Sequence, residues 1–224
     1  MIEAFRLSLL VAGTATLLVV PPGLAAAYLL STRRRLPGRL LLDTALSLPL
    51  VLPPTVVGFA LLQILGRGTA FGRWLNDAAG VQLLFTWPGA ALAASVMALP
   101  LFVRTATAAL SSVDPELLEV GRTLGARGPD LLFRVLVPLS FRGMLAALTL
   151  AFARALGEFG ATLMVAGSIP GETQTLPLAL YASVQAGRTD EAATMALALT
   201  SVAFVSLGIV GLTTDYLARR RGEE

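Results

Sequence analysis

The chain has 224 residues, of which 55% are hydrophobic and 14% charged, and its formal net charge is +3 at pH 7. A soluble domain of this length could not hide so much apolar surface, so we expect an integral membrane protein made of one domain, residues 1–224. The sequence has no cysteine and no histidine, which excludes disulfides, thiol chemistry and histidine bases. We expect no metal site, no catalytic residue and no binding of nucleic acid.

Five apolar runs are long enough to be membrane-spanning α-helices, which predicts an all-α fold. They cover residues 7–30, 44–65, 87–110, 142–166 and 190–212. Arginines cluster after the first run, at Arg33, Arg34 and Arg35, and again after the last, at Arg219, Arg220 and Arg221. Since basic residues favour the cytoplasmic side, we expect the amino terminus outside and the carboxy terminus in the cytoplasm.

The second span is rich in proline, in the sequence SLPLVLPPTVVGFALL. Prolines leave backbone carbonyls without partners, which is tolerated at membrane depth only where the backbone is buried in protein or lines a wet cavity. The prolines are compatible with a kink that shapes the helix bundle and equally with a solute pathway. In the second case, Pro53, Pro54 and Thr55 are candidate pathway residues.

The third span follows a polar loop, residues 66–86, that is expected outside the membrane. Trp74 and Trp87 lie in or beside this loop, as is typical of an interfacial aromatic belt. Within the span, Ala90, Ala94 and Ala98 recur every four residues. Small residues at this spacing favour close helix contact.

The longest polar interruption is residues 111–138, with the sequence DPELLEVGRTLGARGPDLLFRVLVP from Asp114 on. Asp114 is a good helix cap and Pro115 a good first helical residue, so a short helix is expected to begin there and to stop at Gly125. A second helix is expected from Gly128 to Pro138. Both helices are too short to be stable alone in water, so they need a surface to pack on. Another protein is the expected surface.

The fourth span carries two charged residues, Arg154 and Glu158, near its middle. A charged side chain at the bilayer centre costs ~2.5 to 3.5 kcal/mol, so both residues require partners or water. They can pair with each other, and further polar contacts are expected across a dimer or towards Pro53, Pro54 and Thr55. The sequence leaves open whether the pair is a structural ion pair or whether Arg154 faces a pathway for a divalent oxyanion.

The residues Glu119, Gly121, Gly125, Val135 and Val137-Pro138 resemble the cytoplasmic coupling loop of ABC importer permeases. That loop begins Glu-Ala-Ala in the family, and Val120 and Gly121 stand here for the two alanines. The resemblance implies a type I ABC importer permease fold whose coupling loop docks on an ATPase subunit. The candidate coupling residues are Asp114, Glu116, Glu119, Gly121, Gly125 and Pro138.

Two longer stretches are similar to the molybdate and sulfate branch of these permeases. They are the proline-rich second span and residues 153–181, ARALGEFGATLMVAGSIPGETQTLPLALY. The second stretch looks more like the molybdate and tungstate permeases than the sulfate ones. The resemblance implies a homodimer in a bacterial or archaeal plasma membrane and an extracytoplasmic oxyanion-binding protein that faces residues 168–188. The candidate contacts for that protein are Gly171, Thr173, Gln174 and Thr175.

The sequence has no GxxxxGK[ST] loop and no lysine, so ATP and Mg²⁺ are expected on a partner ATPase and no cofactor on this chain. The leading interpretation is the permease subunit of an ATP-driven oxyanion importer, with molybdate or tungstate as the substrate. The alternatives are a sulfate or thiosulfate permease, a membrane-embedded enzyme and a membrane scaffold. Against an enzyme stands the absence of any reactive cluster beyond Arg154 and Glu158.

Overall fold

The computed structural model describes residues 1–32 and 37–220, apart from the side chains of residues 210 and 213–220. Every regular element among the described residues is a helix. The elements are α1 Ile2–Thr32, α2 Arg39–Val51, α3 Pro54–Leu65, α4 Ala70–Arg73, η1 Trp74–Ala78, α5 Trp87–Ser111, α6 Pro115–Thr123, η2 Leu131–Leu136, α7 Val137–Leu139, α8 Phe141–Leu156, α9 Gly160–Ala166, α10 Leu176–Gln185 and α11 Thr189–Arg220. Arg33, Arg34, Arg35 and Arg221 lie outside the described residues, as do the side chains of Arg219 and Arg220.

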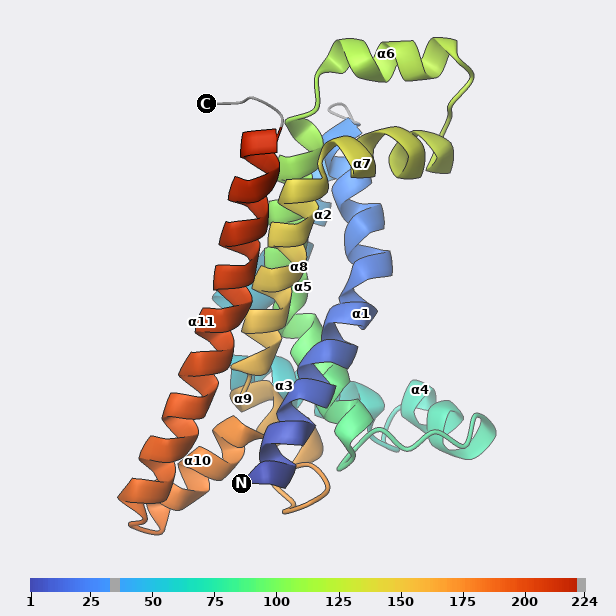
Figure 1. The fold of residues 1–224 in the computed structure, drawn as a ribbon. Coiled ribbons are helices and arrows are strands. Elements are labelled where there is room, and N and C mark those ends of the chain that lie inside the picture. The colour runs from blue at the N-terminus through green and yellow to red at the C-terminus, as the bar shows by residue number, and fades with distance from the viewer. Residues whose placement is uncertain (33–36, 221–224) are drawn as a thin grey trace.

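Three helices are long and apolar enough to cross a membrane by themselves: α1, α5 and α11. They contain the predicted first, third and fifth spans, and they run along the long axis of the molecule (Figure 1). The number rises to as many as five if each of two bent helix pairs counts as one span. The amino terminus and the end of α11 lie at opposite ends of the bundle (Figure 1), as an odd number of crossings requires.

The second predicted span is two helices and not one continuous helix. α2 and α3 meet at an angle of 111° across Leu52 and Pro53. Both linking residues have extended backbones, with ψ of 144° and 135°. Pro53 disfavours a helical conformation at the residue before it, and Pro54 cannot donate a backbone hydrogen bond, so the helix must end and restart here.

The fourth predicted span is also interrupted. α8 ends at Leu156 and α9 begins at Gly160, which leaves residues 157–159 outside any helix. α8 also meets the preceding helical segment, Leu131–Leu139, at an angle of 86°. The predicted coupling loop, residues 111–138, therefore enters the bundle through a sharp turn at Ser140.

The alanine-rich third span is the centre of the molecule. α5 packs against α1, α8, α9 and α2. Two thirds of its apolar window (67%) is buried, against 11% for α11, which places α11 at the edge of the bundle. Ala90, Ala94 and Ala98 are fully buried, in agreement with the close contact that their spacing predicts. Gly23 of α1 lies so close to Phe102 that an added Cβ would fall 2.5 Å from the ring.

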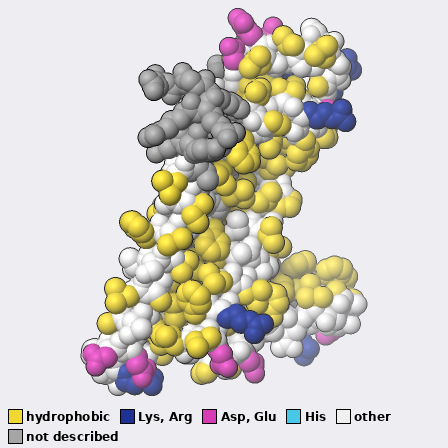
Figure 2. Space-filling view, viewed as in Figure 1, with side chains coloured by type: hydrophobic (Ala, Val, Ile, Leu, Met, Phe, Trp, Pro, Cys, Tyr) yellow, Lys and Arg dark blue, Asp and Glu magenta, His cyan; other side chains and the backbone are white. Residues whose placement is uncertain are grey.

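Charged side chains gather at the two ends of the molecule, while hydrophobic side chains cover most of the middle of the visible face (Figure 2). The exposed large hydrophobic residues include Leu17, Leu41, Val51, Leu197 and Phe204. Side chains of this kind on the outside of a long bundle are suited to lipid or to another membrane chain.

Candidate functional site

The segment predicted to be a coupling loop begins with the helix that the sequence predicts. The Asp114 carboxylate accepts a hydrogen bond from the Glu116 backbone N–H at 2.9 Å, and Pro115 is the first residue of α6. Glu116 and Glu119 are exposed on this helix. Seen in Figure 1, α6 projects beyond the end of the bundle and lies across it.

Glycine shapes the bend and the packing of the loop. Gly125 follows α6 with φ of 89°, a conformation that L side chains adopt with strain, and open space surrounds its Cα. Gly121 is buried, and a Cβ there would lie 3.3 Å from Leu131 and from Val135. The two helices of the loop therefore pack closely at Gly121.

The predicted end of the second helix was wrong. Its first part, η2, is a π-helix, and Pro138 lies inside α7, which continues to Leu139 before the turn at Ser140. Pro138 is the last residue but one of the helical segment Leu131–Leu139, so the segment ends one residue beyond the predicted position.

One face of α6 has no partner within the part of the chain that the structure describes. Leu117, Val120 and Leu124 are three and four residues apart and are 47%, 55% and 82% exposed. Residues at this spacing share one side of a helix. An apolar helix side beside the carboxylates of Glu116 and Glu119 is a surface for another protein.

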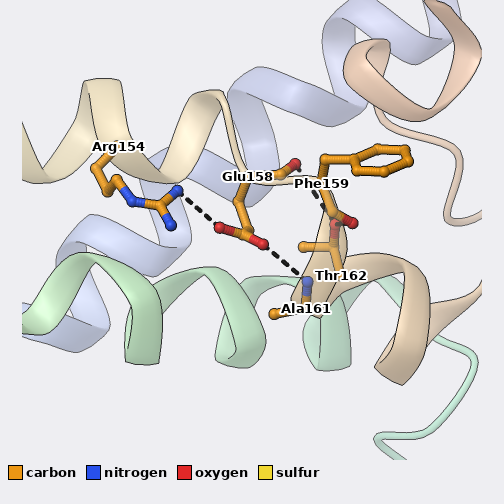
Figure 3. Close-up of polar contacts among 5 residues, drawn as sticks. All are labelled: Arg154, Glu158, Phe159, Ala161 and Thr162. Atoms are coloured by element: carbon orange, nitrogen blue, oxygen red, sulfur yellow. Dashed lines mark hydrogen bonds and ion pairs between the residues drawn. The ribbon is translucent and has the colours of Figure 1, made fainter. Parts of the chain in front are cut away.

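The charged pair of the fourth span lies across the break between α8 and α9 (Figure 3). Arg154 Nη1 donates to Glu158 Oε2 at 2.7 Å, while the backbone N–H of Ala161 donates to Glu158 Oε1 at 2.8 Å. The Glu158 side chain is 1% exposed and that of Arg154 is 27% exposed. The carboxylate thus holds the guanidinium on one side and caps the start of α9 on the other, which suits the helix dipole.

The further polar partner of the pair is therefore a backbone amide and not the second span. No hydrogen bond joins Thr55 to the pair in the described part of the chain. The second span nevertheless comes close, because a Cβ on Gly160 would lie 3.0 Å from Pro54 and 3.4 Å from Thr55. The structure thus places Pro54 and Thr55 beside the start of α9, near Glu158.

The same two helices also touch backbone to backbone further along. A Cβ on Gly58 of α3 would lie 2.8 Å from the Cα of Ala161 in α9. Neither this contact nor the fit of Gly160 against Pro54 was predicted from the sequence. The sequence carried one signal for both contacts, because each glycine lies in one of the two interrupted apolar spans. Glycine in such a span allows the backbones of two helices to approach closely.

At the other end of the molecule, the candidate contacts for a binding protein differ in exposure. Thr173 and Thr175 are buried, and the Thr173 hydroxyl accepts from the Ile169 N–H at 2.9 Å. Gln174 donates to Ser168 at 3.1 Å and is partly buried. Only Gly171 is exposed, so in this conformation a partner at this end would reach it before the other three.

Gly171 lines the largest cavity of those described, about 670 Å³ in volume. The cavity lies between the start of α1, the loop before α5 and the loop after α9. Its charged residues are Glu3, Arg6 and Glu172. Among the described residues no group of three or more carboxylates is placed to hold a metal ion.

One known protein family matches most of the chain. The model of the family described as binding-protein-dependent transport system inner membrane component matches residues 20–223. The chain belongs to this family. Members of it are inner membrane components of transport systems, and the apolar helices of this chain fit a multi-pass membrane protein.

Several curated proteins are similar to this inner membrane component over nearly its whole length. The molybdenum transport system permease protein ModB of Escherichia coli (strain K12) is 44% identical over 218 residues, 97% of this chain and 93% of that protein. ModB of Haemophilus influenzae is 40% identical over 98% of this chain and 94% of its own. The sulfate transport system permease protein CysW of Synechococcus elongatus is 37% identical over 94% of this chain and 73% of its own.

A solved structure described as an amino acid ABC transporter with histidines has the same fold. It aligns with 98% of this chain and 92% of its own, with a TM-score of 0.59 and 18% sequence identity. The expected all-α, type I importer permease-like fold is thus confirmed.

Proposed function

We propose that this chain is the permease subunit of an ATP-driven oxyanion importer, with molybdate or tungstate as its substrate. The observation that carries the transport function is the coupling loop, whose capped helix α6 leaves an apolar side without a partner at one end of a membrane bundle. The choice of ion is supported by the ModB relatives, which are 40% to 44% identical over nearly the whole chain.

The partner of α6 is a cytoplasmic ABC ATPase subunit. Leu117, Val120 and Leu124 enter a cleft on the ATPase, and Glu119 and Glu116 lie at its rim. ATP and Mg²⁺ are bound by the ATPase, since this chain has no phosphate-binding loop and no lysine. Closure of the ATPase pair moves the coupling loop and, through the turn at Ser140, α8.

A second copy of this chain completes the pathway. α2 has no buried residue, and much of α11 is exposed, so the single chain leaves large apolar sides open. Lipid covers part of these sides and the second copy covers the rest. An oxyanion-binding protein delivers the substrate at the outer end, near Gly171 and the cavity of about 670 Å³.

Arg154 lowers the barrier for the oxyanion along this pathway. Its guanidinium has five N–H donors, and one of them is hydrogen-bonded to Glu158. The Arg154 side chain is 27% exposed. Glu158 fixes the guanidinium from a buried position. The remaining donors are free to face a divalent anion.

Reconstitution tests the proposal. The chain, its ATPase and a molybdate-binding protein are placed together in liposomes, and uptake of radioactive molybdate is measured with ATP on the ATPase side. Uptake is expected to require all three proteins and ATP, and tungstate is expected to compete with molybdate. Uptake by this chain alone would contradict the proposal.

A sulfate permease is the second candidate, because CysW is also similar over most of this chain. The same assay separates the two. An excess of sulfate is expected to leave molybdate uptake unchanged. If sulfate or thiosulfate competes as well as molybdate does, the proposed choice of ion is contradicted, while the transport function is not.

The orientation is tested with single cysteines in this cysteine-free chain. A cysteine at Ser112, at the start of the coupling loop, is expected to resist an impermeant thiol reagent added outside intact cells, while one at Gly68 is expected to react. Gly68 is exposed with open space around it, unlike Gly72 of the same loop, which is buried against Gly66. Labelling at Ser112 from outside would reverse the proposed topology.

A further inference from the structure

Two adjoining cavities of opposite character lie where the end of α1 meets the bend of the coupling loop. The first, about 540 Å³, is apolar and is lined by residues of the second half of α1 and by Gly128, Pro129, Leu132 and Phe133. The second, about 430 Å³, is lined by Tyr28, Thr32, Arg122, Ala126, Arg127, Gly128 and Leu131. Tyr28 and Gly128 line both cavities, so the two lie next to each other.

The charge of the second cavity is unbalanced. Arg122 and Arg127 line it, no acidic residue does, and neither arginine forms an ion pair with any residue that the structure describes. Two guanidinium groups without a carboxylate are suited to an anion such as a phosphate group. The polar cavity is therefore half of a binding site that the transport function does not use.

The apolar cavity supplies the other half. Its lining includes Val20, Leu24, Leu29 and Phe133 and has almost no polar surface. It lies against the cytoplasmic half of a predicted span, at the depth of acyl chains in the inner leaflet. Its size is within the range of about 300 to 1,000 Å³ that is usual for ligand sites.

We propose that this pair of cavities binds one anionic phospholipid of the cytoplasmic leaflet. The phosphate lies between Arg122 and Arg127, Tyr28 and Thr32 lie beside the headgroup, and an acyl chain fills the apolar cavity. Such a site matches both the anionic surface of the inner leaflet and the basic pockets that hold its headgroups. The lipid joins the end of α1 to the bend of the coupling loop.

The test measures lipid bound to the full chain purified in detergent, by native mass spectrometry with added phosphatidylglycerol or phosphatidylcholine of the same acyl length. Phosphatidylglycerol is expected to be retained in preference. Replacing both arginines, Arg122→Gln with Arg127→Gln, is expected to weaken its binding about 30-fold. Ala25→Trp, which fills the apolar cavity from an exposed position, is expected to weaken it without any change of charge.

The matched control removes two positive charges elsewhere, Arg134→Gln with Arg188→Gln. Both side chains are more than half exposed and neither lines the two cavities. This control is expected to bind phosphatidylglycerol normally. Equal retention of the two lipids, or equal losses in the control and in the Arg122 and Arg127 variant, would overturn the proposal. So would disulfide cross-linking of an Ala25→Cys chain to a second copy, which would assign the cavity to the dimer.

Discussion

Replacing Arg154 and Glu158 together by glutamine is expected to give a protein that assembles in the membrane but takes up oxyanion poorly. The double change leaves no unpaired charge in the fourth span, and the amide oxygen of a glutamine in place of Glu158 can still accept a hydrogen bond from the Ala161 N–H. It also removes the only guanidinium at this position. Assembly and transport therefore respond differently to the same variant.

The single changes supply the comparison. Removing one partner of a buried ion pair costs about 3 to 5 kcal/mol, because the other charge is left without compensation. Glu158 is only 1% exposed, so Arg154→Gln alone is expected to reduce the amount of assembled protein. Arg154→Lys keeps the charge and is expected to retain both assembly and much of the uptake.

Assembly is measured as the yield of complex with the ATPase, and uptake is measured per assembled complex. If the double variant assembles and transports at the normal rate, the pair is a structural ion pair and Arg154 has no role in the pathway. If the Arg154→Lys protein assembles but does not transport, a single positive charge is not enough, and the proposed role is also contradicted.

The Gly125→Val change is expected to weaken both oxyanion uptake and the ATP hydrolysis that substrate stimulates, without loss of the protein. Gly125 has φ of 89° and open space around it, so valine meets no clash but must adopt a left-handed backbone. That conformation costs an L residue about 1 to 2 kcal/mol. An energy of this size changes a population about 5- to 30-fold, so uptake and substrate-stimulated ATP hydrolysis are expected to fall by a similar factor.

The matched control is Gly80→Val. Gly80 also has a positive φ, 65°, with open space around it, but it lies in the loop between the second and third predicted spans. The same backbone strain is thus imposed far from the coupling loop. Normal uptake by the Gly125→Val protein, or an equal loss in the Gly80→Val protein, would contradict the role proposed for this bend.

The features that the sequence predicted well are those set by local chemistry. Asp114 and Pro115 define the start of α6 through a cap and a fixed φ, and Gly125 provides the left-handed residue that ends it. The lengths of the apolar runs predicted α1, α5 and α11. A run's length is also a local property, since the rise of a helix and the thickness of a bilayer do not depend on the rest of the fold.

The features that the sequence did not predict depend on packing between distant segments. The gap between α8 and α9 contains Gly157, but glycine is common in membrane helices and does not by itself break one. The break is favoured because Glu158 finds the Ala161 N–H and because Gly160 fits against Pro54. The burial of Thr173 likewise depends on a turn that returns the Ile169 N–H to its hydroxyl.

The contact between Gly58 and Ala161 links the two interrupted spans mechanically. α3 and α9 approach so closely at Gly58 that no side chain fits between their backbones there, and close-packed segments transmit displacement to one another. A displacement of α8 that reaches α9 must therefore move α3 as well. The two short helices then move together as one block, so a movement that begins in α8 extends to the interrupted second span.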